Sequence, residues 1–322
     1  MKQVTQTSPG DVQLRSADSS AQAASMLRCF KLETENYCLG LGFVNQAPTS
    51  AQRHALMDQP SERSADAGVE QDIATGDLTP EALVAQRAAL PKSQRVAVEL
   101  DEMQAAWNGR EKARELRELA AGTPTSTSAP TTTPNTIPTT APASAYIMKG
   151  FQTSQEKGYW CGPATFQSID WADDNQKDTQ ASWAKDLGAT TGGTAISAMV
   201  RQTNLKTAWP KSAGTYIVQS VSTWNAQTFL TVHEKHLGVY KAPVIEHVQL
   251  LKRYFPYLAF NHSGHYQVGR GYNKANSTIA IFEVFNERRF NSRGNVTDGP
   301  KNIPASAMFN ATLANSFQNV GL

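Results

Sequence analysis

The sequence has few cysteines, little net charge and no long apolar run. Three cysteines in 322 residues are too few for a disulfide-stabilised scaffold, and an odd number leaves one thiol without an internal partner. A formal net charge of +2 does not favour nucleic-acid binding as the main function. No stretch approaches the roughly 18 consecutive apolar residues of a transmembrane helix, so we expect no membrane span. Hydrophobic residues make up 40% of the chain, which is enough for a folded core.

A Thr/Pro-rich tract divides the chain. Residues 123–144 hold nine Thr, five Pro and three Ser among 22 residues and carry no charge, so they bury too little surface to become ordered. We interpret this tract as a linker of the kind found in exported proteins. It separates an acidic front part, residues 1–122, from a basic part, residues 145–322. The composition therefore predicts a single main domain over residues 145–322.

The front part begins with a polar region that shows little periodicity. We expect residues 1–78 to be largely flexible, apart from a small loop closed by a disulfide between Cys29 and Cys38. The alternative for these two cysteines is a pair of buried reduced thiols. A metal site is less favoured, because metal ligands usually occur as closer pairs and no His pair follows.

Two helices are predicted to follow over residues 79–122. Thr79 suits the N-cap and Pro80 the first helical position, and Pro91 ends this helix. A second helix should start with Ser93 as its cap and run to Ala121. Its predicted apolar stripe has spacings of three and four residues and consists of Val96, Leu100, Met103 and Trp107. We interpret residues 79–122 as a helical arm or prodomain, and we consider that residues 79–121 dock on the main domain.

The strongest chemical signal is the segment QEKGYWCGPATFQSI, which contains Cys161. Residues after Cys161 read as a helix that buries Phe166 and Ile169, and Pro163 suits its first turn. A cysteine at a helix start lies at the positive end of the helix dipole, which lowers the thiol pKa and favours the reactive thiolate. Gly162 allows another group to approach closely. The alternative is a cysteine that packs as a small apolar side chain.

A catalytic thiolate needs a base, and His265 is the best candidate. It opens a short β-like run just after Gly264, whereas His262 is the nearest competitor. The other histidines read differently: His247 lies in an apolar strand, and His233 and His236 lie on a helix surface.

A third group must orient the histidine. A hairpin turn over residues 273–277 places the next strand beside His265, so Glu283 or Asn286 comes near it. Either residue is a candidate for the orienting role.

Five segments together resemble a known family. They are, in this order, QEKGYWCGPATFQSI, ATTGGTAISAMVRQT, APVIEHVQLLKRYFPYL, GHYQVGRGYN and IFEVFNERRF. Together they resemble the papain-fold cysteine peptidases of the bacteriocin-processing type, the thirty-nine-like family of cysteine peptidases. The resemblance is closest to the secreted members from actinobacteria. The resemblance covers residues 145–322. It implies a papain-like α+β domain in which an N-terminal helix carrying the cysteine packs on an antiparallel sheet carrying the histidine.

The resemblance also implies a role for each candidate residue. Cys161 becomes the nucleophile, His265 the general base and acid, and Gln155 the oxyanion donor. Glu283 falls where the family has an orienting Asp before a Pro; here Val284 replaces that Pro. Family members that cut double-glycine leaders are fused to transporters. This chain has no such part, so that substrate is not inherited.

The expected function is a secreted cysteine peptidase or amide hydrolase that acts on a peptide or protein without metal or organic cofactor. The alternatives are a transamidase or acyltransferase that uses the same pair of residues, and a non-catalytic binding or cell-surface module on a peptidase fold. Because the first residues, MKQVTQTSPGD, lack the apolar segment of a secretory signal, export is inferred only from the linker and the cysteine pair.

Overall fold

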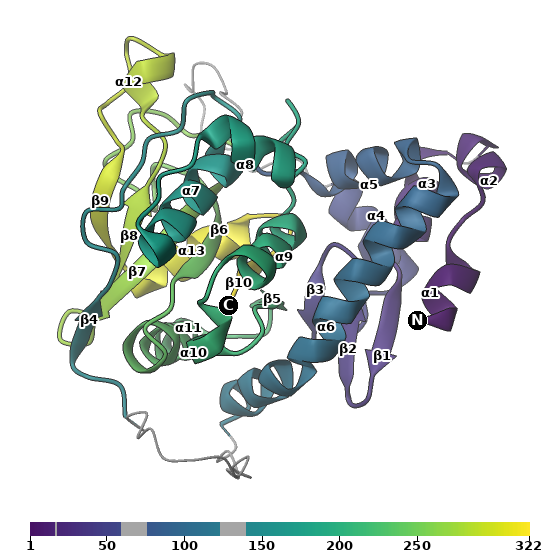
Figure 1. Ribbon diagram of the computed structural model, residues 1–322, viewed down its shortest axis with the longest axis horizontal. Coiled ribbons are helices and arrows are strands. Elements are labelled where there is room, and N and C mark those ends of the chain that lie inside the picture. The colour runs from purple at the N-terminus through teal and green to yellow at the C-terminus, as the bar shows by residue number, and fades with distance from the viewer. Residues whose placement is uncertain (17, 59–75, 123–139) are drawn as a thin grey trace.

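The computed structural model describes residues 1–16, 18–58, 76–122 and 140–322, and its architecture is mixed α+β, as expected (Figure 1). The strands are β1 Cys29–Leu32, β2 Glu35–Cys38, β3 Gly42–Val44, β4 Ser144–Tyr146, β5 Val218–Ser220, β6 Val244–Gln249, β7 Gly264–Asn273, β8 Thr278–Glu283, β9 Gly299–Pro304 and β10 Asn319–Gly321. The helices are α1 Lys2–Thr7, α2 Asp11–Ser16, α3 Ser19–Met26, α4 Ser50–Asp58, α5 Pro80–Ala89, α6 Lys92–Ala120, α7 Cys161–Asp174, α8 Gln180–Asp186, α9 Ile196–Lys206, α10 Pro210–Ala213, α11 Ala226–His233, α12 Glu287–Phe290 and α13 Ala305–Ala314, with a π-helix η2 at Glu234–Val239.

One mixed sheet runs through the whole molecule. Its order is β1-β2-β3-β5-β10-β6-β7-β8-β9, and β4 pairs with β7. The β3–β5 pair is parallel, whereas the pairs on either side of it are antiparallel. The strands of the front part and those of the main domain therefore belong to the same sheet, and β10 lies between β5 and β6 although it is the last strand along the described chain.

Helices cover both faces of this sheet in the main domain. On one face α7 packs on β7 and α9 on β6, around a core that includes Tyr266 and Val268. On the other face α13 packs on β6 and α11 on α13, around a core that includes Val244 and Val248. Because successive strand residues point to opposite faces, neighbouring residues of β7 reach different layers.

The predicted hairpin and the predicted helix at Cys161 are confirmed. Strands β7 and β8 pair antiparallel across the turn at residues 274–277. Helix α7 begins at Cys161 and buries Phe166 and Ile169 completely. Thr79 caps α5, its hydroxyl accepting from the Ala82 amide at 3.1 Å, with Pro80 at the first helical position.

The prediction of a largely flexible region over residues 1–78 is wrong for the part that the structure describes. Residues 2–58 contain four helices and the three strands β1–β3, and side chains such as Val4, Leu14 and Leu27 are buried. Each of the helices α1 and α2 buries a single apolar residue, so the sequence shows no periodic stripe there. Arg28 fixes α1 by donating to the Val4 carbonyl at 2.8 Å. Residues 59–75 lie outside the described residues.

The predicted disulfide between Cys29 and Cys38 is present. It joins paired positions of β1 and β2, so it links two strands that also hydrogen-bond to one another.

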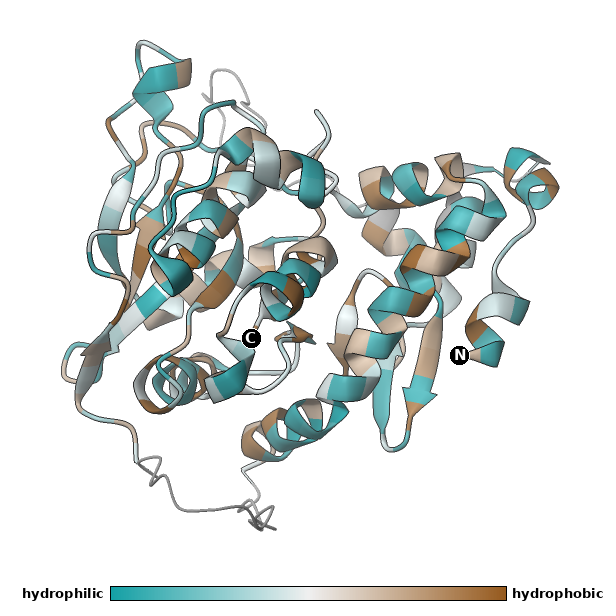
Figure 2. Ribbon diagram, viewed as in Figure 1, coloured by the Kyte–Doolittle hydropathy of each residue, from teal (hydrophilic) through white to brown (hydrophobic). Residues whose placement is uncertain are grey.

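The predicted apolar stripe of the long helix α6 is only partly buried: Met103 is buried and Leu100 packs against the core, but most of the buried residues of α6 lie outside the stripe. Trp107 is 40% exposed, and α6 is largely hydrophilic along its visible length (Figure 2). Glu99 and Glu102 are instead buried, because Arg28 pairs with Glu99 at 2.5 Å and Tyr37 donates to Glu102 at 3.0 Å. The helix also starts at Lys92 without a side-chain cap, so Ser93 is not the cap.

Helix α6 also contacts the main domain. Gly109 lies against Ile217, and the Lys112 ammonium donates to the Leu322 carbonyl at 3.2 Å. The front part is thus joined to the main domain by this helix and by the β3–β5 pair. The linker prediction falls mostly outside the described residues, since 123–139 are among the residues not described.

None of the helices in the described part of the chain combines the length and the apolar character that crossing a bilayer requires.

Candidate active site

Cys161 occupies the first position of α7 and is completely buried. Its sulfur accepts hydrogen bonds from the backbone N–H groups of Gly162 and Tyr266. The second bond brings the thiol to the strand that carries His265, since Tyr266 is the next residue along β7. The Thr165 hydroxyl also donates to the Tyr266 carbonyl, at 3.2 Å, and this bond fixes the first turn of α7 against β7. Two segments a hundred residues apart therefore meet at the sulfur.

The two ring nitrogens of His265 have different surroundings: one faces a carboxylate, and the other has no hydrogen-bond partner among the described residues. Its Nε2 lies 2.7 Å from Oε1 of Glu283, and both side chains are completely buried. Its Nδ1 is also buried and has no hydrogen-bond partner among the described residues. A carboxylate accepts only, so Nε2 carries the proton and Nδ1 of the neutral ring is free to accept one. This is the tautomer that a general base needs.

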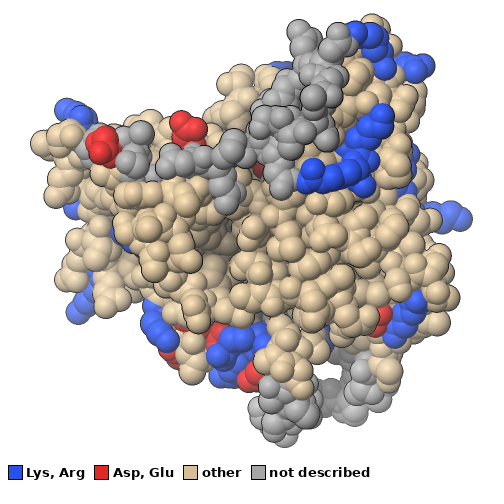
Figure 3. Space-filling view, turned by 180° about the vertical axis from the view of Figure 1, so that it is seen from behind, with Lys and Arg blue, Asp and Glu red and all other residues tan. Residues whose placement is uncertain are grey.

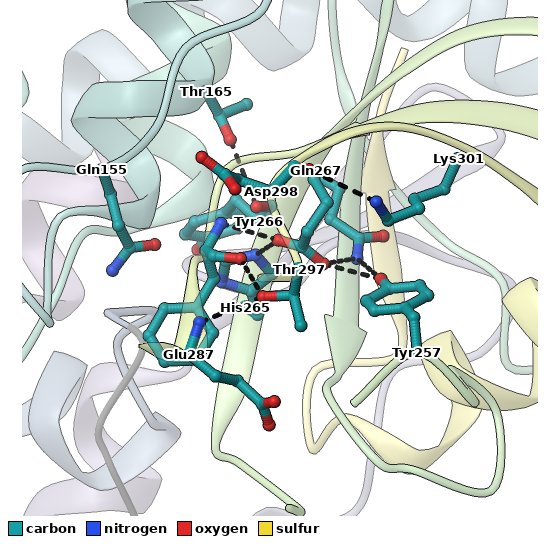
Figure 4. Close-up of polar contacts among 12 residues, drawn as sticks. Gln155, Thr165, Tyr257, His265, Tyr266, Gln267, Glu287, Thr297, Asp298 and Lys301 are labelled. Carbon is teal, nitrogen blue, oxygen red and sulfur yellow. Dashed lines mark hydrogen bonds and ion pairs between the residues drawn. The ribbon is translucent and has the colours of Figure 1, made fainter. Parts of the chain in front are cut away.

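Glu283 is held by four donors. Oε1 accepts from His265 and from the Phe285 amide at 2.9 Å, and Oε2 accepts from the Tyr257 hydroxyl and the Gln267 amide, both at 2.7 Å (Figure 4). Burial by itself would raise the Glu283 pKa, but the pairing with the His265 ring and the other hydrogen bonds hold the pKa below its ordinary value. Glu283 therefore stays ionised.

Glu283, rather than Asn286, bonds to His265. The side-chain amide of Asn286 donates instead to Asp298 at 2.8 Å. Of the two candidates that the sequence left open, the geometry favours Glu283, because strand β8 ends where its side chain reaches the same sheet face as His265 and Gln267.

His262 belongs to a separate network. Its Nε2 lies 2.7 Å from Glu287, whose carboxylate also accepts from the amides of Ala259, Phe260 and Asn295. These bonds hold the Glu287 pKa below its ordinary value against the opposing effect of burial. This network fastens the loop before β7, so His262 has a structural partner of its own.

Gln155 is close in sequence to the site but does not offer a free donor. Its Nε2 donates to the carbonyls of Lys157 at 2.9 Å and Gly158 at 2.7 Å, which uses both of its N–H groups. Its Oε1 is buried without a partner among the described residues. Gln155 also lies apart from the His265 network, with no bond to it (Figure 4). In this arrangement it stabilises the loop before Cys161 rather than presenting a donor to a substrate.

A segment of the front part covers the thiol. Residues 76–78 form a parallel bridge with Thr194, in which the Thr194 amide donates to Gly76 at 2.8 Å and the Leu78 amide donates to Thr194 at 3.0 Å. Gly76 lies against the backbone of Tyr159, and Asp77 lies against Gly264. Tyr159 and Gly264 immediately precede the Cys161 and His265 regions. Residues 76–78 therefore lie across the junction between α7 and β7.

This cover reverses the expected effect on the thiol. The helix start predicts a lowered pKa for Cys161, but burial and then the nearby Asp77 carboxylate raise its pKa well above the ordinary value. The amides of Gly162 and Tyr266 act in the opposite direction and are outweighed. The thiol is consequently neutral and shielded in the structure described here.

The predicted surroundings of two histidines, His233 and His236, are wrong, and the contacts of a third, His247, were not predicted. His233 is completely buried and lies 2.8 Å from Glu246, and His236 is buried as well, so neither is a surface residue. His247 is in strand β6 as expected, but it bonds to Asp77 at 3.1 Å and to Asn319 at 2.8 Å. No local pattern around Asp77 could have indicated this contact, because its partners lie 170 and 238 residues further along the chain.

A comparison of the chain with protein-family models, with curated proteins and with solved structures found no match. The family resemblance stated above therefore stands on the quoted segments alone.

Proposed function

We propose that the chain is a thiol-dependent amide hydrolase, a cysteine peptidase with a papain-like catalytic domain, exported from a bacterium and acting on peptides or proteins. The observation that carries the proposal is the His265 ring, with Nε2 bound to a buried carboxylate and Nδ1 unpartnered. Tyr266, the residue after His265, donates its backbone N–H to the sulfur of Cys161, the one cysteine outside the disulfide. His262 also has Nε2 on a carboxylate and a buried Nδ1 without a partner, so it is the contact of the neighbouring Tyr266 with the thiol that supports the role of His265.

In the proposed reaction His265 takes the proton of Cys161 on Nδ1, and the thiolate attacks the carbonyl carbon of the substrate amide. The C–S bond forms as the carbonyl π electrons move to oxygen. The amide of Cys161, which has no intrahelical acceptor at a helix start, is placed to bind this oxyanion. His265 then gives the proton to the leaving nitrogen, the C–N bond breaks, and water hydrolyses the thioester. Glu283 stabilises the charged imidazolium between these steps.

A non-catalytic binding module is the second candidate, and two observations favour it. The thiol is sealed, and both N–H groups of Gln155 are engaged. For Gln155 to serve as an oxyanion donor, it would have to release one of its two carbonyl partners when substrate enters. A transamidase or acyltransferase would use the same residues, with an amine in place of water.

The test measures how fast iodoacetamide alkylates Cys161 between pH 5 and 9, and whether the protein releases amino groups from denatured casein. Cys161 is the one free cysteine, so alkylation followed by intact mass is unambiguous. We expect His265→Gln to slow alkylation at pH 6 at least 10-fold, because the thiol loses its proton acceptor. Cys161→Ala should abolish both labelling and hydrolysis, while Cys38 and Cys29 remain paired in every variant.

Because residues 76–78 lie beside the buried thiol in the intact chain, both measurements are repeated in Asp77→Ala protein. Equal alkylation rates there with and without His265→Gln at every pH, together with no hydrolysis, would instead identify a non-catalytic module. New amide or ester products formed with an added amine would identify the transferase.

A further inference from the structure

The side chain of Asp77 contacts two buried residues of the main domain, in addition to the backbone bridge between residues 76–78 and Thr194. Its Oδ2 accepts from Asn315 at 3.0 Å and lies 3.1 Å from Nε2 of His247. Both partners belong to the main domain and are buried, and His247 lies between the rings of Tyr266 and Phe317. The carboxylate of a front-part residue therefore fills a polar pocket built by the main domain next to the thiol.

The orientation of each pocket side chain is fixed by a further bond. The Oδ1 of Asn315 accepts from the Phe317 amide at 3.0 Å, so its nitrogen faces Asp77. The Nδ2 of Asn319 donates to the Leu41 carbonyl at 3.0 Å, so its oxygen faces Nδ1 of His247. The pocket thus presents the side-chain amide of Asn315 and a ring nitrogen of His247 to the two-oxygen side chain of Asp77, a combination that suits a carboxylate.

The backbone around the pocket is shaped to admit this segment. A Cβ on Gly264 would lie 1.7 Å from Oδ2 of Asp77, so only glycine leaves room for the carboxylate. A Cβ on Gly76 would lie 2.2 Å from the Tyr159 carbonyl oxygen, so the preceding position also excludes a side chain. The bridge to Thr194 binds the segment through its backbone, as an extended peptide is bound by β-strand addition.

Charge on the surrounding surface agrees with an acidic occupant. Lys and Arg side chains gather at the end of the molecule that carries α12, the helix that follows the Glu283 strand (Figure 3). The exposed arginines there are Arg288, Arg289 and Arg293. Exposed positive charge of this kind attracts acidic peptides to the surface of the molecule.

From these contacts we infer that Gly76–Leu78 is a built-in occupant of the substrate groove, and that the pocket of His247 and Asn315 anchors it by recognising an acidic side chain that follows a glycine. The chain is then latent until this segment leaves, and a peptide with the Gly-Asp pair is the ligand class that the emptied groove takes. The inference rests on the proposed function in so far as it calls the groove a substrate groove. The occlusion of Cys161 by residues 76–78 does not require the thiol to be catalytic.

The experiment uses the full chain and the alkylation rate of Cys161 as its readout. Asp77→Ala removes two charge-assisted hydrogen bonds, and we expect alkylation to become about 10- to 100-fold faster. Asn315→Asp places a second carboxylate against Asp77 and should accelerate alkylation in the same way. The matched controls are Asp101→Ala on α6 and Asn302→Asp on β9, both at exposed positions, which should react like the wild type.

A peptide added in trans separates release of the segment from general unfolding. Acetyl-Gly-Asp-Leu-amide at millimolar concentration should slow the alkylation of the Asp77→Ala protein at least 5-fold, whereas the same peptide with Lys in place of Asp should not. Unchanged alkylation in both variants would overturn the inference. Alkylation of the variant at the rate of the urea-unfolded chain, with no difference between the two peptides, would overturn it as well.

Adding His265→Gln to Asp77→Ala distinguishes failure of this inference from failure of the proposed function. Faster alkylation in the double variant than in His265→Gln alone supports occlusion even when casein is never cleaved.

Discussion

Glu283→Gln is the substitution that most directly tests how His265 is held. The carboxylate has one oxygen for His265 and Phe285 and the other for Tyr257 and Gln267. Glutamine keeps an oxygen for only one of these pairs. The amide can face the second pair, because the Tyr257 hydroxyl can turn and the unpartnered Oε1 of Gln267 can rotate to accept. We therefore expect the variant to fold and to keep an acceptor for His265.

The Glu283→Gln substitution should lower the free energy of unfolding because it removes the negative charge that accepts these hydrogen bonds. A hydrogen bond to a charged group contributes about 1.5–3 kcal/mol and a neutral one about 0.5–1.5 kcal/mol. Two bonds at the His265 side become neutral, so the free energy of unfolding should fall by about 1–3 kcal/mol at pH 7. Amide hydrolysis should fall more than 10-fold, since the imidazolium loses its counter-charge.

The stability difference should depend on pH. The Glu283 pKa is lowered below its ordinary value of 4.5 in the folded chain. Its contribution to stability is then complete above that value and is lost as the pH falls through the lower, folded-state pKa. Urea unfolding at pH 7 and pH 3 should show a difference between wild type and variant that shrinks at pH 3.

The matched control for this experiment is Glu81→Gln, at an exposed position in the first turn of α5. It should show no such difference at either pH. A stability difference between wild type and Glu283→Gln that is absent at pH 7, or equal at both pH values, would refute the reasoning.

Two further predictions concern parts of the fold away from the thiol. Burial, with a smaller effect of Lys235, lowers the pKa of Lys112 to about 7, so below pH 7 the chain buries an ammonium that the unfolded state holds in water. Lys112→Met should therefore be about 1–2 kcal/mol more stable than the wild type at pH 6, and this advantage should shrink as the pH rises from about 7 towards 10.5, whereas the exposed Lys31→Met should show no such change; the midpoint of urea unfolding measures both. His262→Gln weakens the anchor on Glu287, so hydrogen exchange should quicken at the amides of Ala259 and Phe260 while Cys161 alkylation stays unchanged; altered alkylation would place His262 in the site.

The elements that the sequence predicted well are those with local causes. Helix α7, the cap of α5 and the β7–β8 hairpin follow from a glycine, a proline or a turn next to a short apolar run. Spacing along this hairpin was sufficient to bring Glu283 within reach of His265, because strand residues alternate between faces.

The predictions that failed depend on distant partners. The buried face of α6 carries glutamates that are stable there only because Arg28 and Arg87 arrive from other segments. The small helices before β1 bury one residue each and show no period. The raised pKa of Cys161 comes from burial and then from Asp77, whose position nothing near the cysteine could reveal.

The position of β10 has a consequence for folding during synthesis. The strand at Asn319–Gly321 fills the gap between β5 and β6, and only through it does the front hairpin join the strands that carry His265 and Glu283. A ribosome-bound chain that lacks these residues holds two incomplete sheets with open edges, which is a condition that invites aggregation. The front hairpin would thus join the strands that carry His265 and Glu283 late, after residues 76–78 have been synthesised.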